Sequence, residues 1–482
     1  MLALAAMALP ACGDGAEELA ATELRIDGSP RARNLVLIVN DAMRRDRVGV
    51  YGGPAQTPHF DAFARDGLLF WRAYSASPWT KPSMVSLLTS LHPSQHGIVS
   101  HPRLREGADR TLERSTDVLT DGFTTLPELL RDAGYATAAF VGNPWLRREF
   151  GFAQGFEEYD DSLAGWDVPG EVVTDRGLAW LETADRERPF FLYLHYMDSH
   201  RPYGRLRQAD IEARLDELRA DRRPLSEWAA QDIENSVMME GGGSAATVGI
   251  AASVTLLEMA YDRGVEEFDR ALGRFLVSLD AGDLREETAV VVVSDHGEAL
   301  HTRGWGNHGV GLYEDEVAIP LAARLPGVAL RGDRVESPVG LVDLLPTLCG
   351  YLGVKLPAEV RPFGVDWLAP VAVAGRIEDR YLLIEGVMRS PANRAVRFGE
   401  HKAIWQPDAS ERDPLERGLF LVDEDPGETR NLLSADSSAA AIYRRLLEGA
   451  TAASPRHEVP QTEDVTIDPE VVERLRALGY IK

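Results

Sequence analysis

The chain has 482 residues and carries 51 basic against 76 acidic side chains, a formal net charge of −25. Hydrophobic residues make up 44% and charged residues 26%, which is typical of a soluble globular protein. The acidic balance argues against nucleic acid or an anionic membrane surface as the main partner, because both repel a negative protein. An anionic substrate therefore needs a locally positive pocket, and bound metal ions are the expected source of that charge.

The N-terminus is an apolar run, MLALAAMALPAC, that ends in small residues and Cys12. It is too short to span a bilayer and is typical of a bacterial lipoprotein signal peptide over residues 1–12, with Cys12 as the lipidated residue. Residues 13–33 would then form a flexible tether to the cell envelope, in the periplasm or on the outer surface. A frayed N-terminal helix is the alternative. Cys349 lies in an apolar segment, which favours a buried thiol over a disulfide with Cys12.

Continuous apolar, β-branched runs predict strands that are buried on both faces, at residues 34–40, 136–142, 189–196 and 288–294. Helical patterns separate these runs. The alternation predicts an α/β fold with a large mixed, mostly parallel sheet sandwiched by helices.

The remaining segments suggest how the chain is divided. The expected catalytic domain covers residues 34–350, and a strongly charged helical insertion interrupts it at 204–253. This insertion is either a lid over the strand ends or a solvated helical excursion. Residues 351–482 change to the pattern of antiparallel strands, which predicts a smaller C-terminal α+β subdomain.

Polar side chains follow all four predicted strands, where ligands of such sheets bind. They are Asp41, Asn143, the pair Asp198 and His200, and the pair Asp295 and His296. Asp41, Asp295 and His296 together offer two oxygens and one nitrogen, a set that suits Zn²⁺ or Mn²⁺ better than a pure-oxygen Ca²⁺ site. The alternatives are that Asp41 caps a helix and that Asp295 and His296 form a hydrogen-bonded surface pair.

Thr80 is the candidate nucleophile and a further metal ligand. It stands in SPWTKPSMV, where Pro82 fits the first turn of a helix. A helix N-terminus favours negative charge, and a hydroxyl that touches a dication loses its proton more easily. The alternative is that Thr80 only caps the helix. Ser83 and Ser86 are rival hydroxyls that lie deeper in the helix.

A second group consists of Asp198, His200 and His308. These side chains are suited either to hold a second metal ion or to protonate a leaving group. His195 lies within a predicted strand and is expected to belong to the core.

The chain resembles the sulfatase family of the alkaline phosphatase superfamily in an ordered set of motifs from about residue 34 onward. They are NLVLIVNDAMRRDRVGVYG, TPHFDAFARDGLLFWRAYSASPWTKPSMVSLLTSLHPSQHG, FFLYLHYMDSHRPY, VVVVSDHGE, LYEDEVAIPLAARLPG, VGLVDLLPTLCGYLGV and LFLVDEDPGETRNLL. The resemblance implies an alkaline-phosphatase-like fold and hydrolysis of a small-molecule or glycan ester. It also implies a divalent cation (Ca, Mn or Zn), with room for a second. Asn143 would bind a non-bridging oxygen of the substrate.

The sequence departs from the family pattern at the nucleophile. Thr80 and Met84 stand where sulfatases carry the Cys or Ser and the Arg of the motif that is converted to formylglycine. Threonine is not a substrate for that conversion. Relatives in the superfamily that cleave phosphate esters use an unmodified Thr or Ser at this position. His308 also replaces a lysine of the family pattern, as in the metal-richer phosphatase branch.

Three functions follow from these patterns. The first is a metal-dependent sulfatase, which the whole set of motifs supports. The second is a phosphoester, phosphodiester or phosphonate hydrolase or transferase, which Thr80 and His308 support. The third is a non-catalytic surface binding protein, which the loss of the arginine at Met84 supports and the retained metal ligands oppose.

Overall fold

The computed structural model describes residues 23–26, 32–100, 103–106, 112–165, 167–242, 251–282, 284–331, 334–368, 380–388, 390–405, 417–434, 438–453 and 463–466. Cys12 and the expected signal peptide lie outside these residues. Among the helices within them, none combines the length and the apolar character that crossing a membrane requires.

The central element is an eight-stranded sheet with the order β12-β3-β10-β9-β2-β8-β6-β7. Only β10 runs opposite to the other strands of this sheet. The predicted large, mostly parallel sheet is therefore confirmed. The strands are β2 (Asn34–Asn40), β3 (Leu68–Tyr74), β6 (Ala136–Val141), β7 (Glu158–Asp160), β8 (Phe190–Tyr196), β9 (Thr288–Ser294), β10 (Ala318–Arg324) and β12 (Val339–Gly340).

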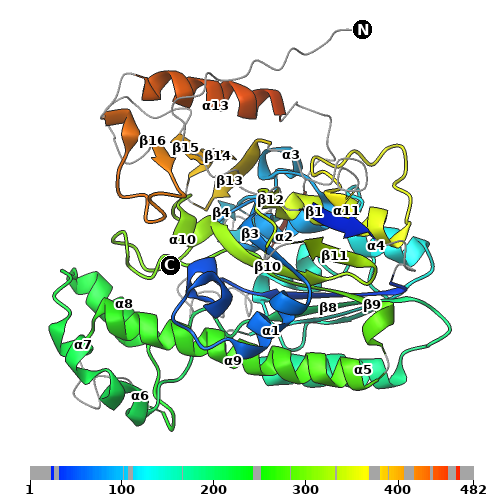
Figure 1. The fold of residues 1–482 in the computed structure, drawn as a ribbon, viewed down its shortest axis with the longest axis horizontal. Coiled ribbons are helices and arrows are strands. Elements are labelled where there is room, and N and C mark those ends of the chain that lie inside the picture. The colour runs from blue at the N-terminus through cyan, green and yellow to red at the C-terminus, as the bar shows by residue number, and fades with distance from the viewer. Residues whose placement is uncertain are drawn as a thin grey trace.

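Helices cover both faces of this sheet (Figure 1). On one side lie α1 (Pro58–Asp66), α5 (Gly170–Thr183) and α9 (Val254–Ala281), and on the other α2 (Thr80–Thr89), α4 (Leu126–Asp132) and α11 (Leu344–Leu352). The short α3 (Pro93–His96) follows α2. Strand residues alternate between two apolar clusters, with Leu35 and Leu37 in one and Val36 and Ile38 in the other.

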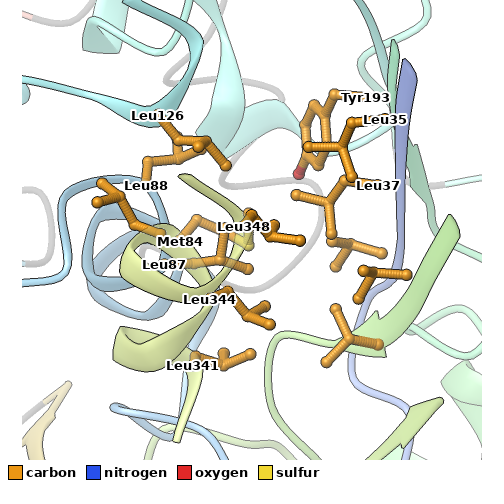
Figure 2. Packing of buried hydrophobic residues seen from close by; sticks show 14 of the residues in the cluster. Leu35, Leu37, Met84, Leu87, Leu88, Leu126, Tyr193, Leu341, Leu344 and Leu348 are labelled. Carbon is orange, nitrogen blue, oxygen red and sulfur yellow. The ribbon is translucent and has the colours of Figure 1, made fainter. Parts of the chain in front are cut away.

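The packing in the first cluster fixes the position of α2. Figure 2 shows Met84, Leu87 and Leu348 turned toward Leu35 and Leu37 of β2. Cys349 of α11 is buried in the same cluster, as expected. Because interiors are close-packed, this contact holds the N-terminus of α2 in a fixed place beside the sheet.

The described part of the insertion 204–253 contains three short helices, and the second and third of these contact α9. They are α6 (Gln208–Ala213), α7 (Leu215–Ala220) and α8 (Glu227–Ser236). Ile211, Leu218 and Ile233 are buried in the cluster that α9 shares with the sheet. The described part of the insertion is therefore packed onto the domain through these apolar residues.

A separate antiparallel sheet forms the C-terminal part, as predicted, with the order β13-β14-β15-β16. Its elements are β13 (Leu382–Val387), β14 (Ser390–Phe398), β15 (His401–Trp405), β16 (Gly418–Leu421) and the helix α13 (Ala439–Ala453). The short α10 (Glu314–Val317) lies beside it in Figure 1. Tyr313, next to α10, and Val317 pack in one apolar cluster with Ile384 and Phe420 of this sheet.

Two terminal segments pair with strands that are distant in the sequence. Strand β1 (Glu23–Ile26), which lies within the expected tether 13–33, pairs with β11 (Val328–Arg331). Strand β17 (Glu463–Thr466) leaves the C-terminal sheet and pairs with β5 (Leu112–Val118), which also pairs with β4 (Arg103–Glu106). In both cases the pairing satisfies backbone hydrogen-bonding groups that an extended segment would otherwise expose.

Candidate active site

Thr80 is the first residue of α2, and its hydroxyl does not cap that helix. The hydroxyl oxygen lies 3.2 Å from His296 Nε2, 3.3 Å from Asn143 Nδ2 and 3.4 Å from Asp41 Oδ2. The interpretation of Thr80 as a cap is therefore wrong. The side chain instead faces the residues that follow the parallel strands.

The rival hydroxyls of α2 are engaged elsewhere. Ser83 Oγ donates to the carbonyl oxygen of Asp295 at 2.7 Å, and Ser86 Oγ lies 3.2 Å from His96 Nε2. The bond from Ser83 ties the first turn of α2 to the end of β9. It thereby holds Thr80 against the residue pair at that strand end.

Lys81 follows Thr80 but its ammonium group points away from the site. Its Nζ lies 2.6 Å from Asp117 Oδ1 and 2.7 Å from the carbonyl oxygen of Ser100, beneath the rings of Trp79 and Trp145. Its charge is thus neutralised in the interior and does not bind an anion beside Thr80.

Three predicted metal ligands meet beside Thr80. His296 Nε2 lies 3.6 Å from Asp41 Oδ1 and 3.4 Å from Asp295 Oδ2. Both of these carboxylate oxygens are buried without a hydrogen-bond partner, although the second oxygen of each carboxylate has one. A buried, unpaired carboxylate oxygen is unfavourable, so the pair fits a site for a divalent cation.

The charges of these carboxylates support the same conclusion. Burial and the nearby Asp41 raise the pKa of Asp295 well above its usual range. Burial would also raise the pKa of Asp41, but the imidazoles of His200, His195 and His296 hold that pKa below its usual range. Two carboxylates this close do not both ionise without a positive partner, which a cation provides.

His195 is a site residue that the sequence did not reveal. It lies on β8, as predicted, but its Nε2 is 3.0 Å from Asp41 Oδ2 and its Nδ1 is 2.6 Å from Tyr193 Oη. Asp41, His195 and Asp295 offer ligand atoms within 4.8 Å of one another. The available signal was a histidine inside an otherwise apolar run.

His200 and His308 lie next to this cluster, with ring centroids 5.1 Å apart, and the His308 ring lies 4.3 Å from that of His296. His200 Nδ1 is 2.6 Å from the carbonyl oxygen of Arg201, and His296 Nδ1 is 2.8 Å from that of Gly297. Each Nδ1–H therefore donates, which leaves the ring lone pair on Nε2. Metal-binding histidines show this pattern.

Glu298 plays the same part for the third imidazole. His308 Nδ1 lies 3.1 Å from Glu298 Oε2, so Glu298 orients the His308 ring. Burial lowers the pKa of His308 to about 4 and that of His296 to about 3. These rings are thus neutral at pH 7, and they bring no positive charge to an anion. Glu298 belongs to the SDHGE motif, in which the sequence predicted a functional role only for Asp295 and His296.

Asp198, the third residue predicted to act with His200 and His308, contacts a different element. Its Oδ1 accepts a hydrogen bond of 2.9 Å from the backbone N–H of Gly170 at the start of α5. A Cβ atom on Gly170 would lie 2.4 Å from Asp198 Oδ2, so the carboxylate is packed against that helix. Burial raises its pKa to about 7. The contacts of Asp198 are thus at the start of α5, whereas His200 lies next to His308.

Asn143 does lie in the site, but its side chain is occupied. Its Nδ2 is 2.5 Å from Asp41 Oδ2 and its Oδ1 accepts from the backbone N–H of Trp145 at 2.7 Å. It therefore orients Asp41 and Thr80, whereas the sequence suggested a contact with substrate.

The sequence is similar to that of known sulfatases. A family model described as sulfatase matches residues 33–354. The arylsulfatase of Clostridium perfringens is 23% identical over 475 residues, with 84% of this chain and 90% of that protein covered. The N-acetylgalactosamine-6-sulfatase of Canis lupus familiaris is 27% identical over 413 residues, covering 80% of this chain and 74% of that protein.

Solved structures share the fold. A protein in complex with its substrate D-glucosamine-2-N,6-O-disulfate superposes with a TM-score of 0.67 at 18% identity, covering 88% of this chain and 98% of that one. The phosphonate monoester hydrolase of Agrobacterium radiobacter superposes with a TM-score of 0.62 at 20% identity, covering 87% of this chain and 95% of that one.

Proposed function

The chain belongs to the sulfatase family, whose members are hydrolases acting on sulfuric ester bonds. From this premise we propose that it cleaves a sulfate ester with the unmodified hydroxyl of Thr80 as the nucleophile. The observation that carries the proposal is the position of that hydroxyl, 3.2 Å from His296 Nε2 and beside two buried, unpaired carboxylate oxygens.

We infer that Asp41 Oδ1, Asp295 Oδ2 and His296 Nε2 hold a divalent cation, Ca²⁺, Mn²⁺ or Zn²⁺. When bound, a cation favours the alkoxide of a nearby hydroxyl and offsets the negative charge of the sulfuryl oxygens. His195 donates from Nε2 to Asp41 Oδ2 and so supports the Asp41 carboxylate from behind.

In the proposed reaction the sulfuryl group is transferred in two steps, first to Thr80 and then to water. In the first, Thr80 Oγ bonds to sulfur while the bond from sulfur to the leaving oxygen breaks, and the proton of Thr80 ends on the leaving alkoxide. In the second, water attacks the sulfur, the bond to Thr80 Oγ breaks and Thr80 regains a proton, which releases hydrogen sulfate. We assign the acceptance and return of these protons to His200 and His308, whose Nδ1 contacts leave the ring lone pairs on Nε2.

His200 and His308 have an alternative role, which is to bind a second metal ion. The Nδ1 bonds to Arg201 and Glu298 orient both rings as they would for a metal ligand. Asp198 belongs to neither version, because it is bonded at the start of α5.

A phosphoester or phosphonate is the second candidate substrate. The observations in its favour are the unmodified Thr80 and the fully buried, apolar Met84 at the position of the family arginine. Both ester classes present a tetrahedral, anionic centre to the same nucleophile, so the site geometry serves either reaction.

The test compares p-nitrophenyl sulfate, p-nitrophenyl phosphate and bis-p-nitrophenyl phosphate after the protein has been stripped of metal and reloaded with Mn²⁺, Zn²⁺ or Ca²⁺. We expect hydrolysis of the sulfate to need the metal and to fall at least 1,000-fold in Thr80→Ala. Ser94→Ala is the control. Ser94 is an exposed residue of α3 whose backbone N–H donates to Glu385, and the substitution keeps that bond. Turnover that survives Thr80→Ala contradicts the proposal. Metal- and Thr80-dependent turnover of the phosphates alone favours the second candidate.

We also propose that the protein is anchored at the bacterial cell envelope through lipid on Cys12. The support is the sequence of residues 1–12, in which an apolar run and small residues precede the cysteine. The expected result is that the full chain partitions into the membrane fraction and that Cys12→Ala releases it. Equal partitioning of both proteins contradicts the anchor.

A further inference from the structure

Helix α8 of the insertion presents an exposed tryptophan, Trp228. The side chain of Trp228 is 58% exposed, yet its ring packs edge-on against the buried His301 at a centroid distance of 5.4 Å. The indole is therefore held by a ring contact with the protein, while more than half of its surface is open to solvent. Tryptophan offers a large apolar ring with a polar N–H, and this residue type is enriched at binding interfaces.

Asp232 joins this helix to the catalytic domain. It lies four residues after Trp228 and thus on the same face of α8. Its Oδ1 is 2.7 Å from Arg201 Nη1, and its Oδ2 is 2.9 Å from His301 Nε2. One carboxylate therefore holds both the residue that supports Trp228 and the residue that follows His200.

The loop that carries His301 is built for this contact. Leu300 and His301 adopt positive φ angles of 49° and 57°, which non-glycine residues rarely do. A Cβ atom on Gly306 would lie 2.3 Å from His301 Nε2 and 2.5 Å from Asp232 Oδ2, so only glycine allows the approach. Strain of this kind persists only where the surrounding structure holds it, and it gathers at functional sites.

Arg201, which is paired with Asp232, connects α8 to the segments that carry His200 and His308. Its Nη1 donates to Asn307 Oδ1 at 3.2 Å, and these two residues are the direct neighbours of His200 and His308 in the chain. The Arg201 side chain is 22% exposed, so part of the guanidinium faces solvent. A cation thus lies next to the segments that carry the imidazoles to which we assign the leaving group. Asp232 links this cation to His301, against which the indole packs.

We propose that Trp228 and Arg201 form a subsite for a pyranose sugar, the alcohol part of the ester, with Asp232 as the positioning residue. The proposal rests on the proposed function. The flat apolar face of an indole matches the C–H face of a pyranose ring, and Arg201 offers N–H donors to its hydroxyl or anionic groups. The insertion then selects the substrate, while the strand ends perform the reaction.

The test separates binding from turnover. Affinity for sulfated disaccharides derived from heparin and from chondroitin is measured by calorimetry in the Thr80→Ala background, and kcat and KM are measured in active protein. We expect Trp228→Ala to weaken binding of at least one disaccharide ten-fold or more. In active protein it should reduce kcat/KM for that disaccharide at least ten-fold more than for p-nitrophenyl sulfate. Trp228→Phe should restore most of the affinity.

Two further variants complete the design. Asp232→Asn should raise KM for the disaccharide more than it lowers kcat, because it releases Arg201 and His301 without touching the reacting atoms. Val277→Ala, at a 66% exposed apolar position of α9, should change nothing. The proposal is overturned if no disaccharide binds, or if Trp228→Ala binds like its parent. Neither result affects the Thr80 test with small aryl esters, so the two proposals fail separately.

Discussion

The side chain of Asn143 contacts both the proposed nucleophile, Thr80, and a carboxylate of the proposed metal site, Asp41. Its amide nitrogen lies 2.5 Å from Asp41 Oδ2 and 3.3 Å from Thr80 Oγ1, while its oxygen is held by the backbone of Trp145. All three of these hydrogen bonds are buried. Removal of such a donor costs about 1–3 kcal/mol.

We expect Asn143→Ala to lower kcat about 10- to 100-fold with little change in KM, because each 1.4 kcal/mol is a factor of ten in rate. Steady-state kinetics with p-nitrophenyl sulfate provide the measurement. Asn235→Ala, at an exposed position of α8, serves as the control. A rise in KM at unchanged kcat would instead assign Asn143 to a substrate oxygen, the role that its sequence position suggested.

At the scale of elements, the strand ends were predictable because parallel strands share one polarity. The sheet order places β9, β2, β8 and β6 next to one another, so the residues after them meet at one edge. Four apolar runs and this rule were enough to predict that a group of polar residues would meet there, namely Asp295, His296, Asp41, His200 and Asn143. The start of α2 was predictable from Pro82, and packing against β2 then places Thr80 at the same edge.

Other features depend on contacts that a local pattern does not contain. Asp198 and His200 are two residues apart in one turn, yet one meets α5 and the other meets His308. His195 is buried like the rest of β8, and only the partner beyond its ring distinguishes it from core. The pairing of β1 with β11 joins segments about 300 residues apart, so its partner is set by the tertiary fold.

At the scale of the whole molecule, the C-terminal sheet completes the wall of the site. Trp79 Nε1, next to Thr80, donates to the carbonyl oxygen of Gly386 at 2.7 Å. The backbone N–H of Met388 donates to the carbonyl oxygen of Gly309, next to His308, at 2.9 Å. The end of β13 and the residue after it therefore contact the segments that carry the nucleophile and one of the imidazoles.

A buried cluster of charges attaches this sheet to the catalytic domain. Lys402 Nζ of β15 lies 3.1 Å from Glu314 Oε1 of α10 and 3.0 Å from Glu428 Oε1. All three side chains are buried. Burial raises the pKa of Glu428 to about 7, although Lys402 opposes that rise. Without the lysine, the two carboxylates would face each other with less compensation, and the pKa of Glu428 would rise further.

We therefore expect Lys402→Met to destabilise the protein in a pH-dependent way. A carboxyl group whose folded-state pKa exceeds its unfolded value supports stability below the unfolded value, and that support is lost as pH rises through the folded one. The loss relative to wild type should be small at pH 5, where Glu428 is protonated. It should reach about 3–5 kcal/mol at pH 8, where a buried charge lacks its partner. Urea unfolding at both pH values provides the measurement.

The double variant Lys402→Met/Glu428→Gln should recover most of the stability at pH 8, because Arg45, 3.6 Å from Glu314, remains as the partner of the one carboxylate left. Arg430→Ala, which removes a surface cation near the same sheet, should leave the unfolding midpoint unchanged at both pH values. Equal losses in Lys402→Met at pH 5 and pH 8 would assign the effect to the packing of the lysine methylenes. In that case apolar contacts such as those of Val317 with Ile384 would hold the C-terminal sheet against the site.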